Sequence, residues 1–446
     1  MVSSPQSSVV SAQNRRIAAS ILRIAWPVAL ARLGIMGMGL ADTIMVGQLA
    51  PDELGWQALG WAPTGVFLVA AIGLLAGVQV LTARVMGEGR PEASGAVWRR
   101  GLVLAVLSGT AALGLLWAFG EQALEAFGIA PELSGPAADV MRILALSLPL
   151  HLIYIASAFY LEALRRPVAA TVIMWVANVL NLGLNAALIP AFGAEGSAWA
   201  TVGARFFLAA ALVIWILRLK DSKALGVWGG AAAPGISYRA LLGVGVAAAV
   251  SQAVEAGAFS AMTVIAGRIG EEAVAAYAIL LNLLSLIFMI ALGLAAATAV
   301  QVSEGIGAKQ RAEATRSAWI GLGLNTLAML GAGAVLLAAP DLIARVYTAD
   351  VALAAIVAGQ MLWAAAILAP DGGQVVAASA LRARGDNWAP TANHIVAYAL
   401  IMPSMGYYLA EVQGQGVAGL MAAIFWASVV SAAVLCARQW VLGRRG

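Results

Sequence analysis

Long apolar segments recur twelve times along this chain, and they constrain its fold more than any other feature. They cover residues 20–46, 56–83, 97–119, 136–160, 167–189, 195–217, 239–266, 274–300, 315–338, 352–381, 389–409 and 416–437. About 20 apolar residues are enough for a helix to cross a bilayer, and in lipid only helices or closed barrels satisfy every backbone polar group. Hydrophobic residues make up 62% of the 446 and charged residues only 11%, which excludes an ordinary soluble domain. The sequence therefore predicts an all-α integral membrane protein with twelve transmembrane helices, whose surroundings are the lipid bilayer.

Basic residues are sorted between alternate loops. One set of loops, together with the two tails, holds 21 of the 26 Lys and Arg residues, whereas the other set holds only Arg268 and Arg345. Because basic loops face the cytoplasm, both termini are predicted to be cytoplasmic and the number of helices to be even. The net charge of +4 follows from this arrangement and gives no reason to expect binding of nucleic acid.

The second half of the chain repeats the first. Residues 43–58 (TIMVGQLAPDELGWQA) align with residues 263–278 (TVIAGRIGEEAVAAYA) at an offset of 220, and further short matches follow in the same order. An even number of helices in each half gives both halves one orientation, so we predict two parallel six-helix lobes related by a pseudo-two-fold axis along the membrane normal. Such an architecture predicts a functional monomer. The predicted domains are a cytoplasmic tail (1–19), an N-lobe (20–217), a cytoplasmic linker (218–238), a C-lobe (239–437) and a second cytoplasmic tail (438–446).

Three carboxylates stand well inside apolar segments: Asp42, Glu255 and Asp371. A charge near the bilayer centre costs about 2.5–3.5 kcal/mol on the mildest scale, so such a residue usually lines a cavity, binds a cation or relays protons. Asp371 lies in the tenth segment beside a proline and two glycines, where a bend would free backbone carbonyls next to the carboxylate. We therefore predict that these acids couple transport to a cation, with a site for a hard cation or a proton at Asp371.

Glu255 and Asp371 would act as a pair if they faced one cavity. Their charges would repel each other and burial would disfavour ionisation, so the pair would favour a bound proton or Na⁺. Gln252 lies three positions before Glu255 and therefore shares its helix face. It is predicted to hydrogen-bond either the acid or the ligand.

Asparagines mark the fifth segment at Asn178, Asn181 and Asn185. Asn181 and Asn185 are four residues apart, so they stack on one helix face. Two interpretations are open, namely hydrogen bonding between helices and the lining of a polar cavity in the N-lobe.

Other polar residues within the segments are predicted to be structural. Arg142 follows Asp139 by three residues and should pair with it, while Arg205 should snorkel or pair across helices. His151 and His394 are far apart in the sequence, which favours packing or hydrogen bonding over a metal site.

Several short motifs, in a fixed order, give the chain a resemblance to a known family. They are ADTIMVGQLAPDELGWQALG in the first segment and its loop, EALRRP after the fourth, VSQAVEAGAF in the seventh, GIGAKQRAEA after the eighth, and APDGG with ALRARGDNWAP around the tenth. Together with the twelve segments and the repeat, they resemble the multidrug and toxic compound extrusion (MATE) transporters, in particular the NorM branch. The resemblance covers essentially the whole chain.

This resemblance implies antiport across the inner membrane of a bacterial cell. Na⁺ or H⁺ would enter down its gradient while a small organic, often aromatic, cation leaves by alternating access, with no prosthetic group. Glu255 and Asp371 match the acidic pair of the C-lobe, which would bind Na⁺ in a sodium-coupled protein, and Asp42 matches the acid of the N-lobe. The polar neighbours of that N-lobe acid are matched by Asn181, Asn185 and Thr201.

Two alternatives to an ion-coupled exporter stay open. A lipid-carrier flippase of a related family would share the repeat, but it would need a basic cavity for pyrophosphate lipids, whereas the predicted sites are acidic. A membrane-embedded enzyme would need a nucleophile or a metal motif. The sequence contains no GxxxxGK[ST], HExxH or GxSxG motif, which favours a transporter that ATP does not drive directly over an enzyme.

Overall fold

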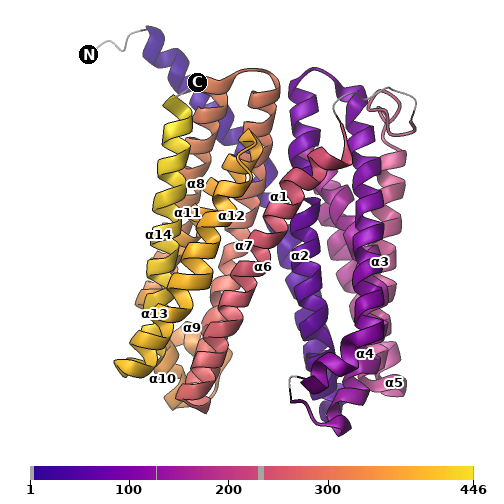
Figure 1. Ribbon diagram of the computed structural model, residues 1–446, viewed down its shortest axis with the longest axis vertical. Coiled ribbons are helices and arrows are strands. Elements are labelled where there is room, and N and C mark those ends of the chain that lie inside the picture. The colour runs from indigo at the N-terminus through magenta and orange to yellow at the C-terminus, as the bar shows by residue number, and fades with distance from the viewer. Residues whose placement is uncertain (1–4, 127, 230–235, 445–446) are drawn as a thin grey trace. The chain divides into compact units, whose positions relative to one another are not determined.

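Within residues 5–126, 128–229 and 236–444, which the computed structural model describes, every regular element is helical (Figure 1). The first half contains α1 (Pro5–Leu49), η1 (Pro51–Glu53), α2 (Leu54–Gly87), η2 (Pro91–Ala93), α3 (Ser94–Ala126), α4 (Pro131–Ala163) and α5 (Val168–Leu217). The second half contains α6 (Tyr238–Ile269), α7 (Glu271–Gly307), α8 (Arg311–Ala338), α9 (Pro340–Tyr347), α10 (Val351–Gly359), α11 (Met361–Arg384), α12 (Trp388–His394), η3 (Ile395–Ile401), α13 (Met402–Tyr407), η4 (Tyr408–Val412) and α14 (Gly416–Arg444). Eleven helices in the described ranges are long and apolar enough to cross a membrane, so the predicted all-α membrane fold is confirmed.

The difference between eleven and the predicted twelve lies in α5. A straight helix of its 50 residues would be about 75 Å long, far more than the roughly 30 Å of a hydrocarbon core. Gly193 interrupts it with φ 54° and ψ −135°, a conformation that is not helical. Gly196 lies directly against the backbone of Leu188, and Gly203 lies against the side chain of Leu184, contacts that only a reversal of the chain allows. The two parts of α5 correspond to the predicted segments 167–189 and 195–217, which is compatible with twelve spans.

Two compact units divide the chain inside helices rather than at the linker. Unit 2 comprises Leu30–Ala249, and unit 1 comprises the chain before Leu30 and from Val250 onward. The first part of α1 therefore packs in unit 1, and the first part of α6 packs in unit 2. These units differ in their boundaries from the predicted lobes 20–217 and 239–437, because hydropathy marks where a helix lies but not which neighbours it contacts.

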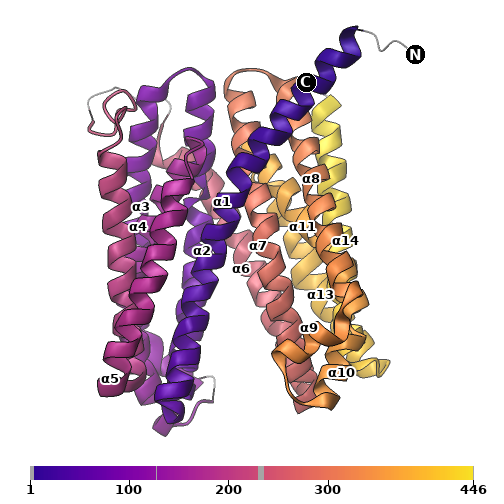
Figure 2. The ribbon, with the colours of Figure 1, turned by 180° about the vertical axis from the view of Figure 1, so that it is seen from behind.

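Each unit is organised around one central helix. In unit 2, α4 contacts α2, α3 and α5, and in unit 1, α11 contacts α7, α8 and α14. Aromatic side chains fill both cores: Tyr154 and Tyr160 are almost fully buried in unit 2, as are Tyr277 and Tyr398 in unit 1. In unit 1 the start of α1 and the end of α14 lie at one end, and α9 and α10 lie at the other (Figure 2).

The structure describes most of the predicted tails and linker; residues 1–4, 230–235 and 445–446 lie outside the described ranges. Helix α1 already begins at Pro5, where a proline is well suited to the first helical position, and Ile17 is buried in unit 1. At the other terminus, α14 continues to Arg444. The linker is anchored to α3, because the guanidinium of Arg99 donates to the carbonyls of Gly226 and Val227. Helices α1 and α14 thus extend into the predicted tail segments 1–19 and 438–446.

Candidate functional site

Asp42 is buried in unit 2 and accepts two short hydrogen bonds. Its Oδ1 accepts from Asn185 Nδ2 at 2.6 Å, and its Oδ2 accepts from Thr201 Oγ1 at 2.6 Å. Asn185 Nδ2 also donates to Asn181 Oδ1 at 3.2 Å, so Asn181 supports the same cluster. The structure thus brings together Asp42 with three of the polar residues singled out in the sequence.

Asn178 forms a hydrogen bond between helices, which is the first of the two interpretations given for the asparagines of this segment. Its Nδ2 donates to the carbonyl of Gly34 at 3.1 Å and to that of Met174 at 2.9 Å. The first bond joins α5 to α1 in the way expected of a polar residue that links membrane helices. Asn178 therefore ties the helix that carries Asp42 to the helix that carries its partners.

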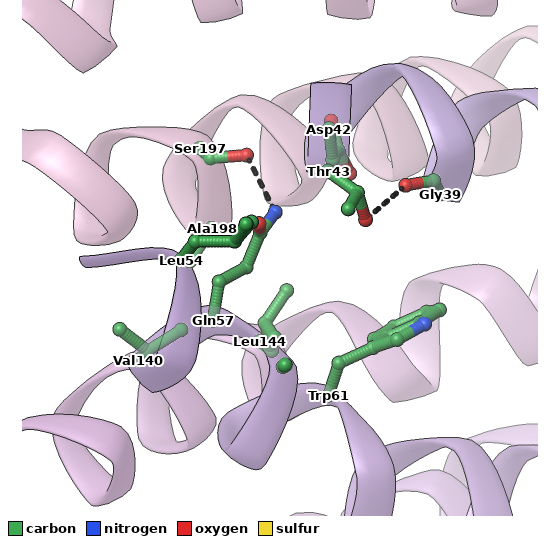
Figure 3. A pocket seen from close by; sticks show the side chains of 11 residues that line it. Gly39, Asp42, Thr43, Leu54, Gln57, Trp61, Val140, Leu144, Ser197 and Ala198 are labelled. Atoms are coloured by element: carbon green, nitrogen blue, oxygen red, sulfur yellow. Dashed lines mark hydrogen bonds between the residues drawn. The ribbon is translucent and has the colours of Figure 1, made fainter. Parts of the chain in front are cut away.

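Two small cavities meet at Asp42. The first cavity is lined by Asp42 and Thr43 of α1, Gln57 and Trp61 of α2, and Ser197 of α5. In Figure 3, Asp42 and Thr43 project from α1 on one side of it, and Gln57 and Trp61 of α2 lie on the opposite side. The second cavity shares Gly39, Asp42 and Trp61 with the first, so a ligand in either one would face the carboxylate.

The wall of the second cavity also carries basic side chains. Arg205 is 3% exposed, donates its Nη1 to Ser147 Oγ at 2.8 Å, and places its guanidinium over the ring of Trp61 at 5.2 Å from the centroid. The prediction that Arg205 pairs across helices is confirmed by these contacts with α4 and α2. His151 lines the same cavity and is 2% exposed.

Another buried carboxylate of unit 2, Glu162, was not singled out in the sequence. It accepts from Gln79 Nε2 at 2.6 Å and pairs with Arg32 Nη2 at 3.4 Å, and both bonds join it to helices other than its own. The predicted pair of Arg142 with Asp139 is confirmed at 2.7 Å, and Arg142 also binds Glu121 at 2.8 Å. These ion pairs stabilise helix contacts away from Asp42.

Glu255 of α6 and Asp371 of α11 both lie in unit 1, near enough to interact electrostatically. Gln374, one turn after Asp371, donates its Nε2 to Glu255 Oε1 at 3.3 Å. The buried Gln374 Oε1 has no hydrogen-bond partner among the described residues. The amide oxygen of Gln374 therefore lies near the two carboxylates, and no described residue donates a hydrogen bond to it.

Hydroxyl groups complete the surroundings of Asp371. Its Oδ1 accepts from Tyr398 at 3.1 Å and from Ser428 at 3.3 Å. Tyr398 belongs to η3, a π-helical stretch, and such stretches often occur at functional sites because the extra residue per turn redirects side chains. Carboxylate, amide and hydroxyl oxygens are ligands suited to a hard cation.

A second set of polar contacts connects Glu255 to the positively charged side chain of Arg382, by way of His394 and Ser251. His394 Nδ1 lies 3.9 Å from Glu255 Oε2 and 2.8 Å from Ser251 Oγ. The same hydroxyl accepts from Arg382 Nη2 at 2.8 Å. The sequence favoured packing or hydrogen bonding for His394, and its contact with Ser251 is a hydrogen bond. The structure brings His394 and Arg382 together at the edge of the acidic pair.

Gln252 was predicted to hydrogen-bond the acid or the ligand, but the amide that reaches Glu255 is that of Gln374. Sequence spacing could have identified Gln374, since it lies three residues after Asp371 on the same helix. Tyr398 and Ser428 had no comparable signal because they belong to other helices. Among the described residues, no group of three or more His, Cys, Asp or Glu side chains could hold a metal ion.

Comparisons with known proteins find relatives that match most of the chain. The family model MatE matches residues 27–187 and again residues 247–408, and these two matches start 220 residues apart, the offset of the sequence repeat. A probable multidrug resistance protein NorM of Caulobacter vibrioides is 42% identical over 95% of this chain and 92% of its own length. The multidrug resistance protein PmpM of Pseudomonas aeruginosa is 29% identical over 87% of this chain and 83% of its own.

Solved structures share the fold. The eukaryotic MATE transporter AtDTX14 matches with a TM-score of 0.88 and 16% identity, covering 97% of this chain and 98% of its own. An outward-facing multidrug resistance MATE family transporter of the MOP superfamily matches with a TM-score of 0.87 and 18% identity, over 96% of both chains. At these identities the likeness concerns the fold alone.

Proposed function

Since the chain belongs to the MATE family and to its NorM branch, we propose that this multi-pass membrane protein exports organic, often aromatic cations in exchange for Na⁺ or H⁺. The observation that carries the proposal is the placement of Asp42, Glu255 and Asp371 inside spanning helices, each within a polar network. Relatives named as multidrug resistance proteins support a broad substrate range.

The coupling ion is assigned to Glu255 and Asp371. Close carboxylates repel each other, and a bound proton or Na⁺ relieves that repulsion. Gln374 Oε1 and the hydroxyls of Tyr398 and Ser428 add oxygen ligands around the pair. The charge of Arg382 acts on Glu255, so a single added cation brings this cluster close to neutrality.

Asp42 is assigned to substrate binding or to coupling in unit 2. Its carboxylate faces both cavities, and Trp61 provides an aromatic surface beside it. A ligand with a positive charge and a flat ring would find both an ion-pair partner and an aromatic contact there. Asn185 and Thr201 hold the carboxylate in place, so the ligand would meet a preorganised acceptor.

The energy available from an ion gradient is sufficient for this task. One elementary charge that crosses a potential of about 100 mV releases roughly 2.3 kcal/mol. Because about 1.4 kcal/mol corresponds to a tenfold change in an equilibrium, one net charge per cycle supports a substrate gradient of roughly 50-fold. The assignment therefore requires no other energy source.

Efflux of ethidium from proteoliposomes tests this function. An imposed Na⁺ or pH gradient should drive efflux by the native chain, and Glu255→Gln and Asp371→Asn should each lower it by about tenfold or more because the coupling ion loses a charged ligand. Glu272→Gln is the matched control, since Glu272 is an exposed carboxylate of the same unit. Efflux that survives in both variants would transfer the coupling role to Asp42.

The same assay distinguishes the alternatives. No efflux by the native chain under either gradient would contradict the exporter and favour a lipid-carrier flippase, which flipping of a fluorescent pyrophosphate lipid in the same vesicles would reveal. Conversion of a substrate into a new product would instead indicate a membrane-embedded enzyme. We also propose insertion in the inner membrane with both termini in the cytoplasm, which reporter fusions at each terminus would test.

A further inference from the structure

The start of α1 has a buried face that fixes it within unit 1. The buried side chains recur every three or four residues, at Ile17, Ile21, Ile24 and Val28. Polar contacts hold the same stretch against two neighbouring helices. Gln301 of α7 donates a hydrogen bond to Ser20. Arg316 of α8 donates one to Gln13. The opposite face of this stretch is therefore held in a constant direction.

That opposite face carries arginines followed by a tryptophan. Its exposed residues are spaced by three, four and three positions, which places them on one side of the helix: Arg16, Ala19, Arg23 and Trp26. Arg15 is exposed beside them, and the ring of Trp26 is 56% exposed. These five residues are called the α1 stripe below.

The charge of the α1 stripe is not compensated within the chain. No hydrogen bond or ion pair joins Arg15, Arg16 or Arg23 to another residue in the described ranges. Residues 5–41 contain no Asp or Glu. Arg32, the remaining arginine of α1, differs because it pairs with Glu162. An anion that binds the α1 stripe must therefore come from outside the described chain.

The order of residues along the α1 stripe matches the layers of a membrane surface. With a rise of 1.5 Å per residue, Arg23 lies about 4.5 Å and Arg16 about 15 Å from Trp26 along the helix axis. The headgroup region on each side of the hydrocarbon core is about 5–8 Å thick, and Trp rings concentrate at its inner boundary. With Trp26 at that boundary, Arg23 lies among the headgroups, and the long side chain of Arg16 can reach back toward them.

A second pair of arginine and tryptophan lies at the same end of unit 1, where α14 ends beside the start of α1 (Figure 2). The guanidinium of Arg444 stacks on the ring of Trp440 at 3.7 Å from the centroid, and this ring is 49% exposed. Stacking occupies the face of a guanidinium and leaves its N–H groups at the edge for an acceptor. The α1 stripe is thus continued by a second exposed site of the same composition.

We propose that the α1 stripe binds the phosphodiester headgroups of anionic phospholipids in the cytoplasmic leaflet. A guanidinium binds phosphate through two parallel hydrogen bonds. A lipid fits better than a soluble anion, because the exposed side chains of Leu22 and Trp26 adjoin the arginines and a soluble anion would leave them in water. This inference goes beyond export, and the choice of leaflet rests on the proposed cytoplasmic position of the termini.

Native mass spectrometry of the purified full-length protein tests the proposal. The protein is offered an equimolar mixture of phosphatidylglycerol and phosphatidylcholine with identical acyl chains, and the retained lipids are counted. The native chain should retain phosphatidylglycerol in at least about tenfold preference, since each basic residue near an anionic surface contributes about fivefold. The combined change Arg15→Gln, Arg16→Gln and Arg23→Gln should reduce the preference to less than about twofold.

Two comparisons separate charge from other effects. Lysine at the same three positions should keep most of the preference, because it retains the charge without the planar fork. Arg345→Gln is the matched control and should leave the preference unchanged, since Arg345 is an exposed arginine of α9 at the other end of unit 1. If the triple Gln variant does not fold, Arg23→Gln alone should still lower the preference by about twofold to fivefold.

Equal retention of the two lipids by the native chain would overturn the proposal, as would an unchanged preference in the Gln variants. Retention of a short single-stranded RNA that displaces the lipid and is lost in the same variants would assign the α1 stripe to a soluble polyanion, and would also overturn it. Because the measurement involves no transport, its result is independent of whether the chain exports cations.

Discussion

The reversal of the chain inside α5 depends on a contact between Gly193 and Glu53. Glu53 Oε2 accepts a hydrogen bond from the backbone N–H of Ala194 at 2.7 Å, so its carboxylate caps the first turn of the second part of α5. A Cβ at Gly193 would overlap this carboxylate, and the φ of 54° disfavours any residue with a side chain. We therefore predict that Gly193→Ala destabilises the protein by two separable effects.

The magnitude follows from these two effects. The unfavourable backbone conformation costs about 1–3 kcal/mol. Displacement of Glu53 forfeits a hydrogen bond to a charged group, which contributes about 1.5–3 kcal/mol. Gly193→Ala should thus lower the free energy of unfolding by roughly 2.5–6 kcal/mol in the native background, but only by about 1–3 kcal/mol in a Glu53→Ala background.

Equilibrium unfolding in mixed micelles of a mild detergent and SDS measures this double-mutant cycle. The expected coupling free energy between positions 53 and 193 is about 1.5–3 kcal/mol. Gly183→Ala is the matched control, because Gly183 is a helical and exposed residue of α5 with open space at its Cβ, and its change should lie within about 1 kcal/mol. An equal cost for Gly193→Ala with and without Glu53 would refute the reasoning.

Three further outcomes are expected. Asp42→Asn should abolish export of cationic dyes, measured in the proteoliposome assay, while the protein still elutes as a single folded species; undiminished export would contradict its role. Glu255→Gln combined with Asp371→Asn should reduce export no further than the more severe single variant, because both residues serve one ion; multiplied losses would indicate separate sites. Outside the membrane-spanning segments, the hydrogen bonds from Arg166 hold the pKa of Asp221 below its usual range. The ion pair therefore stabilises the fold at pH values above the pKa that Asp221 has in the unfolded chain. This stabilisation is lost as the pH falls through the lower pKa of the folded state. Since both partners are partly exposed, Asp221→Asn should change the unfolding free energy by no more than about 1 kcal/mol at neutral pH. In thermal melts below about pH 4, the variant should lack the part of the acid-induced fall in stability that this pair causes.

Much of the site could be anticipated from single residues. A carboxylate within an apolar segment is conspicuous whatever the fold, so the sequence alone identifies Asp42, Glu255 and Asp371. The polar neighbours of Asp42 followed from the family resemblance rather than from spacing. In the structure, Asn185 and Thr201 donate hydrogen bonds to Asp42.

Other members of the site could not be anticipated because their roles depend on helices distant in the sequence. Tyr398 and Ser428 reach Asp371 from 27 and 57 residues away, and Arg382 reaches Ser251 across 131 residues. The sequence favours packing or hydrogen bonding for His151, and only its burial beside a cavity, with no partner among the described residues, distinguishes it from an ordinary core residue.

By itself, the sequence determined that the chain is a helical membrane protein with an internal repeat and intramembrane acids. These properties depend on hydropathy, periodicity and charge, which are local and can be read residue by residue. Only the tertiary structure decided that α5 reverses at Gly193, that α1 and α6 are each divided between the two units, and which hydroxyls, amides and guanidinium groups meet the acids. The physical reason is that burial and hydrogen bonding are properties of pairs of residues brought together by packing, and hydropathy along one helix does not specify its neighbours.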